Sequence, residues 1–267
     1  MDQLLKALRL FRLEVKSSDT TSLSYYLLLS VVPSLTLLVI LLNWLHLDVL
    51  KFETLLLQFF SDDLTAQLIA FMQQKDVSYI SIFTIIMCLL ISSRGIFKMK
   101  QVSDRLYGFT NKQTRYVKSR FSAVVNTLFF LLIVVFLVLL IGFLPGVGFV
   151  ISTLSLVPFS RYLLTFLAIH GLMLLINLIV PSDVPRLIDV YLGSLVSTIG
   201  IMALLIFYEA FFNISTYTNL YGPLASIAAV LIILNWMSNV IYFGISLSAV
   251  RHREYMERKG NRWSEKQ

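Results

Sequence analysis

A few polar and ionisable side chains interrupt the long apolar runs of this sequence, and these are the residues that could bind a substrate or transfer a proton. They are Arg94, His170, Asn177, Glu209, Asn235 and Asn239. A charge or an amide within hydrocarbon costs free energy, so such residues usually pair across helices or line the path of a substrate or an ion. We therefore take these six as candidates for a substrate path or for binding a lipid headgroup.

Spacing suggests how these candidates could act. His170 and Asn177 are close to two helical turns apart and so lie near the same helix face. His170 is either a neutral histidine bonded to a neighbouring helix or a proton relay. Asn235 and Asn239 are one turn apart, and are expected either to hydrogen-bond between helices or to line a polar cavity. Arg94 ends an apolar run, where it could anchor to headgroups or bind substrate.

The motifs of the common enzyme classes do not occur in this sequence. Its single cysteine, Cys88, has no thiol partner, and His46, His170 and His252 show no metal-ligand spacing. No nucleophile–base pair and no phosphate-binding loop stands out. We therefore expect no catalytic residues, no metal site and no cofactor, and we expect that the protein is not an enzyme.

Composition indicates the surroundings of these residues. Of 267 residues, 57% are hydrophobic and only 14% are charged, whereas a soluble domain carries about 25% charged residues. Six runs provide the roughly 20 apolar residues that a bilayer-spanning helix needs. These runs are 23–45, 79–97, 121–143, 162–180, 187–208 and 224–250. Since backbone groups in hydrocarbon must pair within a segment, the predicted fold class is all-α, a polytopic membrane bundle of six transmembrane helices.

The segments outside the spans complete the predicted organisation. Residues 1–22 mix charge and leucine at helical spacing, which is typical of an amphipathic helix on the membrane surface. Residues 51–76 are too polar to span and are expected to form short amphipathic helices on the outer surface. Residues 251–267 form a basic tail. The prediction is therefore one transmembrane domain, residues 23–250, between two cytoplasmic segments.

Lysine and arginine predict the orientation, because they concentrate on the cytoplasmic side of membrane proteins. Of the 22 basic residues, 19 lie in the N-terminal segment, the segment between spans two and three, the link between spans four and five, or the tail. The alternate loops hold only Lys51, Lys75 and Arg161. Both termini are therefore predicted to face the cytoplasm.

The segment SSRGIFKMKQVSDRLYGFTNKQTRYVKSR, residues 92–120, is the most basic part of the chain. It holds eight Lys or Arg and one acid, Asp104. Nucleic-acid binding also needs groups that read or stack on bases, and the pattern here is not specific for it. We expect no nucleic-acid partner. The segment is expected to fix the orientation, or also to attract anionic lipid headgroups at about 1 kcal/mol per residue.

Acidic residues lie near the ends of the fourth and fifth predicted spans. Asp183 and Asp189 flank the link between spans four and five and are expected to be solvated. Glu209 stands at the outer end of the fifth span, where it is either hydrated or part of a substrate path.

Prolines and small residues predict helix breaks and close helix contacts. The predicted breaks and turns are at Pro33, Pro181, Pro185 and Gly222. Gly193, Ser197 and Gly200 make a stripe of small residues on the fifth span, and Gly244 and Ser248 make another on the sixth. Such stripes let membrane helices approach closely.

Four stretches of the sequence carry a family resemblance. They read SLSYYLLLSVVPSLTLLVILL, SSRGIFKMKQVSDRLYG, VPSDVPRLIDVYLGSLVST and STYTNLYGPLASIAAVLIILNWMSNVIYFGISLSAV. In order and spacing they resemble the YihY/BrkB family of inner-membrane proteins, once labelled ribonuclease BN. The resemblance covers about residues 22–251. It implies a multi-pass protein of the bacterial inner (plasma) membrane, a link to serum resistance and, for some relatives, lipid export.

The sequence departs from the family pattern at one position. The family's GAELNA-like stretch reads GISLSA here, with Ser246 in place of the acid.

Two functions are candidates for this protein. The first is transport-related, moving or helping to move a lipid or other amphiphile, and a cavity lined by Arg94, His170, Asn177 or Asn235 would favour it. The alternative is a non-transporting scaffold that binds other envelope proteins, which a tightly packed bundle would favour. Ribonuclease activity is not expected.

Overall fold

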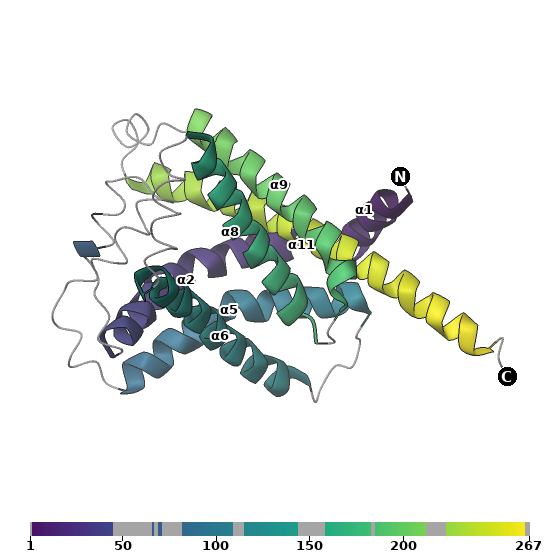
Figure 1. The fold of residues 1–267 in the computed structure, drawn as a ribbon, viewed down its shortest axis with the longest axis horizontal. Helices are drawn as coiled ribbons and strands as arrows, with labels where there is room; N and C mark the ends of the chain where they lie inside the picture. The colour runs from purple at the N-terminus through teal and green to yellow at the C-terminus, as the bar shows by residue number, and fades with distance from the viewer. Residues whose placement is uncertain are drawn as a thin grey trace. The chain divides into compact units, whose positions relative to one another are not determined.

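The computed structural model describes residues 2–44, 66, 69–70, 82–108, 115–143, 158–182, 185–211 and 223–264. Figure 1 shows the helices of these ranges. They are α1 (Asp2–Glu14), α2 (Ser17–Trp44), α5 (Ile82–Tyr107), α6 (Arg115–Phe143), α8 (Pro158–Ile179), α9 (Leu187–Phe211) and α11 (Pro223–Ser264). The all-α prediction is confirmed for the described part of the chain. The predicted outer helices at 51–76 lie outside it, apart from three residues.

Each of the six predicted spans falls on one helix. Two stretches of the described chain are long and apolar enough to cross a membrane, Leu187–Phe207 of α9 and Ala228–Arg258 of α11. Shorter apolar stretches, Ser119–Ile133 and Thr165–Ile179, lie in α6 and α8. Two described helices therefore have the length and composition of a membrane span, while the count of six stays a prediction.

The N-terminal segment contains a helix break that the sequence analysis did not predict. α1 ends at Glu14 and α2 begins at Ser17. The backbone N–H of Lys16 donates to Oδ2 of Asp19 at 3.0 Å. This is half of a capping box, in which an acid at the third helical position receives the N–H of the capping residue. Asp19 therefore fixes the start of α2, where the helix dipole also favours a negative charge.

The chain forms two compact units. The first comprises Met1–Leu28, Gly95–Ala123 and Ala168–Gln267, and the second comprises Leu29–Arg94 and Val124–Leu167. α9 and α11 belong wholly to the first unit, which also holds every polar cluster described below. α2 passes from the first unit to the second close to Pro33, and the helix continues through this proline.

α9 and α11 pack side by side in the first unit (Figure 1). A Cβ atom added at Gly193 would overlap the carbonyl oxygen of Gly244 and the side chain of Ser248, and one added at Gly244 would overlap the side chain of Ser197. A Cβ at Gly200 would lie 2.6 Å from a valine methyl of α11. The predicted small-residue stripes therefore meet each other at a close helix crossing.

Two further contacts frame this helix pair. α1 packs on α11, with Ala7 against Leu247 and Val250. Buried Pro181 and Pro185 lie between the end of α8 and the start of α9, where a break was predicted. α8 therefore ends before these prolines and α9 begins after them.

Candidate functional site

A series of polar side chains connects α8, α9 and α11, and we name it the polar track; all of its members are buried except His170, which is half-buried. Its members are His170 and Asn177 of α8, Ser194 and Thr198 of α9, and Ser248 of α11. Nδ1 of His170 lies 3.2 Å from Oγ1 of Thr198. The Asn177 amide donates to Oγ of Ser194 at 3.0 Å, and Oγ of Ser248 donates to Oδ1 of Asn177 at 3.4 Å. The two candidates predicted to share a face of α8 therefore belong to one network.

The polar track extends well into the apolar helices. Thr198 lies 11 residues beyond the start of α9, which is about 16 Å at the helical rise of 1.5 Å per residue. Oγ1 of Thr198 also donates to the Ser194 carbonyl at 2.8 Å, which links the two halves of the track. His170 and Thr198 can each donate and accept a hydrogen bond, but the link from Thr198 to Ser194 runs through a backbone carbonyl, so the track is not a continuous path for a proton. The same bonds tie three helices together, at roughly 0.6–2 kcal/mol each.

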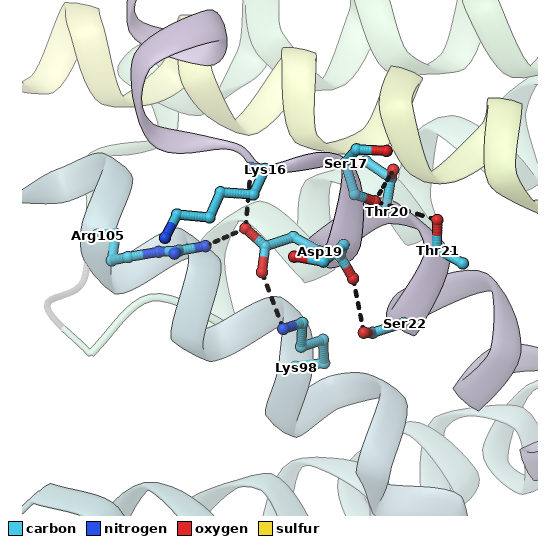
Figure 2. A network of polar contacts seen from close by, with 9 residues as sticks. Lys16, Ser17, Asp19, Thr20, Thr21, Ser22, Lys98 and Arg105 are labelled. Atoms are coloured by element: carbon cyan, nitrogen blue, oxygen red, sulfur yellow. Dashed lines mark hydrogen bonds and ion pairs between the residues drawn. The ribbon is translucent and has the colours of Figure 1, made fainter.

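Asp19 lies at the centre of an ionic cluster that joins the start of α2 to α5 (Figure 2). Its carboxylate pairs with Nζ of Lys98 at 2.9 Å and with the guanidinium of Arg105. Only 6% of the Asp19 side chain is exposed, against 20% of Lys98 and 35% of Arg105. Burial by itself raises the pKa of Asp19, but hydrogen bonds from Lys98, the Lys16 backbone and Arg105 lower it below its ordinary value of 3.8.

The pKa shift of Asp19 predicts an acid sensitivity. A carboxyl whose pKa is lower in the folded state stabilises that state at pH values above its unfolded pKa. This contribution should be complete at neutral pH and should be lost as the pH falls below about 4 towards the folded pKa. The measurement is the free energy of unfolding of wild type and of Asp19→Asn at pH 7 and near pH 3. The difference between the two proteins should shrink in acid, and a difference that is equal at both pH values would contradict this account.

A second carboxylate, Asp189, is buried near the start of α9. Arg186 donates to its two oxygens at 3.0 and 2.8 Å, and Nδ1 of His252 lies 3.4 Å from Oδ2. The Arg186 guanidinium also lies 3.1 Å from the centre of the Tyr255 ring. Burial, together with the Asp189 charge, raises the pKa of nearby Tyr107. The prediction that Asp189 is solvated is wrong, because the arginine three residues earlier and α11 enclose it.

Part of the basic segment faces inward and contacts the turn between α8 and α9. Lys100 is buried, and its Nζ donates to the Val180 carbonyl at 3.3 Å. Asp104 accepts hydrogen bonds from the backbone N–H and the hydroxyl of Ser182, at 2.9 and 2.7 Å. Of the eight basic residues predicted as an orienting or headgroup-binding segment, Lys98, Lys100 and Arg105 therefore also hold helices together.

The other candidate residues are described separately from the polar track. Arg94 is exposed on α5 and belongs to the second unit. The Asn239 amide donates to the Asn235 carbonyl at 2.8 Å, a bond along α11, and both the bond between helices and the polar cavity stay predictions. Glu209 is helical, but its side chain lies outside the described residues, as does Gly222.

Sequence reasoning missed several members of these clusters. Ser194 and Thr198 stand one turn apart in a predicted span, a spacing like that of Asn235 and Asn239, which was noticed. Asp19 is an acid in the first turn of a helix, the position at which capping residues are found. The sequence contains both features, the Ser194–Thr198 spacing and the acid at a helix start. Because residues 1–22 were predicted as a single helix, Asp19 was not recognised as lying at the start of one.

A family model described as Virulence factor BrkB matches residues 17–267, nearly the whole chain. The chain belongs to the Virulence factor BrkB family. The match begins at the first residue of α2, so the polar track and the acidic centres of both clusters lie within the BrkB match. The comparisons with curated proteins and with solved structures gave no match.

Ser246 of this BrkB chain occupies the position where the resemblance implies an acid. Its hydroxyl is buried and donates to the Tyr242 carbonyl one turn earlier, at 2.8 Å. The side chain is therefore satisfied within α11 and supplies no charge. A mechanism that needs a carboxylate at this place does not carry over to this protein.

Proposed function

We propose that this BrkB-family protein is an integral membrane protein of six spans with both termini in the cytoplasm. We further propose that it moves, or helps to move, a lipid or other amphiphile across the bacterial inner membrane. The placement of the basic residues supports the orientation, and two long apolar helices support membrane insertion.

The observation that carries this proposal is the polarity of the helices around the track. On α9, Ser194, Ser197 and Thr198 are fully buried, whereas Ile199 and Ile206 are exposed. On α8 and α11 the exposed large side chains are also apolar; they include Leu163, Leu167, Leu172, Ile232 and Trp236. Apolar side chains outside and hydroxyl or amide groups inside suit a surrounding of hydrocarbon. Intramembrane polar groups are, by default, candidates for a substrate or proton path.

An amphiphile fits these surroundings better than a small hydrophilic solute. Its acyl chains could stay beside the exposed apolar faces while its polar part meets hydroxyl, amide or basic groups. The basic residues predicted on the cytoplasmic side would attract anionic headgroups at about 1 kcal/mol each. This chain has no phosphate-binding loop, so movement would not be driven by ATP hydrolysis of its own.

The scaffold is the second candidate, and the close crossing of α9 and α11 favours it. Gly193 and Gly244 allow contact without an intervening space, and the track residues bond to one another. In this alternative the track is a packing device, and the protein binds other envelope proteins through its exposed segments.

Lipid movement in proteoliposomes tests the proposal. The purified protein would be reconstituted with a trace of fluorescent anionic phospholipid, and dithionite quenching would report lipid that reaches the outer leaflet from the inner one. We expect movement above that of empty vesicles. Thr198→Val removes the hydroxyl that faces His170 and should slow movement about fivefold if roughly 1 kcal/mol is lost in the path.

Two controls make this result specific. Ile199→Val changes the exposed neighbour of Thr198 and should leave the rate unaltered. His170→Ala should slow movement like Thr198→Val, and each variant used must still be folded at the temperature of the assay. Rates equal to those of empty vesicles across several lipid classes would exclude unassisted movement, and the scaffold would replace it as the proposed function.

A further inference from the structure

The start of α9 and the adjacent part of α11 form an apolar groove of about 380 Å³. Its walls are Leu187, Ile188, Tyr191 and Leu192 of α9, and its one charged group is Arg251 of α11. Leu187 and Ile188 are 65% and 69% exposed, so the groove opens to the surroundings of the helices. None of the residues for which a polar cavity was predicted lines it.

Arg251 is the cation that remains available at this groove. Its neighbours on α11 are occupied, because His252 contacts Asp189 and Arg253 donates to the Arg105 carbonyl at 3.4 Å. Asp189, the acid nearest in sequence to the groove walls, is paired with Arg186 and His252. No acidic side chain in the described ranges forms an ion pair with Arg251.

We propose that this groove binds one anionic phospholipid of the surrounding bilayer, with its phosphate at Arg251 and an acyl chain along Leu187–Leu192. This inference rests on the proposed function and deepens it, because it names a substrate class and a place. On the predicted orientation, the lipid belongs to the cytoplasmic leaflet.

Shape and charge together favour this occupant. Three aliphatic side chains and the ring of Tyr191 make most of the wall, which offers little to a water-soluble anion. One cation at the edge of such a wall matches a headgroup joined to a hydrocarbon chain. The volume lies within the range of about 300–1,000 Å³ that small-molecule sites occupy. The first turn of α9 adds the positive end of a helix dipole beside the groove.

Photocrosslinking in nanodiscs tests the site. The full chain would be placed in phosphatidylcholine nanodiscs that contain a small fraction of phosphatidylglycerol with a photoactivatable acyl chain, or phosphatidylcholine with the same chain. Peptide mass spectrometry would locate the crosslinks. We expect the phosphatidylglycerol probe to label residues 187–192 about tenfold more than the phosphatidylcholine probe, the discrimination expected of one charge-assisted contact.

Matched variants separate charge from shape. Arg251→Gln should reduce phosphatidylglycerol labelling to the phosphatidylcholine level, Arg251→Lys should retain most of it, and Arg258→Gln, an exposed arginine of the same helix, should change nothing. Leu192→Trp should reduce labelling by both probes, because it fills the groove.

Equal labelling by both probes in wild type, or unchanged labelling in Arg251→Gln, would overturn the site. The experiment measures occupancy and not movement. A labelled groove in a protein that fails the dithionite assay would leave the lipid site standing while the transport proposal falls. Movement without labelling of the groove would leave the transport proposal standing while the lipid site falls.

Discussion

Replacing Gly193 with valine should strongly destabilise the protein, because this position has no room for a side chain. Even one Cβ atom would overlap the Gly244 carbonyl oxygen and the Ser248 side chain. Backbone cannot rotate away as a flexible side chain can, so α9 and α11 would have to separate. Overpacking of a tight contact costs about 1–3 kcal/mol and occasionally more, and we expect at least the upper end here, since three side-chain atoms are added.

Gly171→Val is the matched control for this variant. Gly171 lies on α8, and a Cβ atom there would meet nothing within 4 Å. Both variants add the same side chain to an apolar helix, so helix propensity and hydrophobicity change equally. Thermal unfolding in detergent should show a large loss for Gly193→Val and a small change for Gly171→Val. Equal losses would show that the close crossing is not important for stability.

Asp19→Asn should have the second largest effect, because it removes the only carboxylate of a cluster that holds two cations. Lys98 and Arg105 would then lose the negative charge that both of them pair with. Breaking a buried pair costs about 3–5 kcal/mol. The two cations keep some access to water, so we expect a smaller loss of about 2–3 kcal/mol in the free energy of unfolding.

Two further variants check that charge is the cause. Glu254 pairs with Lys6 at 2.7 Å, but 59% of the Lys6 side chain is exposed. Glu254→Gln should therefore cost less than about 1 kcal/mol. Adding Arg105→Met to Asp19→Asn removes one of the unpaired cations and should recover part of the stability. If the double variant is less stable than Asp19→Asn alone, repulsion between the cations is not the source of the loss.

The apolar helices were the most predictable part of this structure, because the length of an apolar run locates them, whereas the break between α1 and α2 was missed. The start of α9 at Leu187 follows from Pro181 and Pro185, which end one helix before the next begins. The small-residue stripes also predicted a close contact correctly, since Gly193 and Gly244 leave few alternatives.

The polar clusters were harder to predict, because they depend on how helices are aligned with one another. The spacing of His170 and Asn177 predicts that they share one face of α8. Their partners on α9 and α11 depend on how these two helices are aligned along their axes, which the contact of Gly193 with Gly244 sets. Asp189 was misjudged for a different reason. Its polar neighbourhood suggested water, whereas α11 approaches closely enough to place His252 beside it.

The orientation of the chain decides the proposed membrane topology and the leaflet from which the groove would take its lipid. It can be measured by replacing Cys88 with alanine and introducing one new cysteine at a time, at Ser264 at the end of α11 or at Ser215 between α9 and α11. A membrane-impermeant maleimide would then be applied to intact spheroplasts and, separately, to permeabilised ones. We predict that Ser264→Cys reacts only after permeabilisation and that Ser215→Cys reacts in both. Reaction of Ser264→Cys in intact spheroplasts would contradict the account.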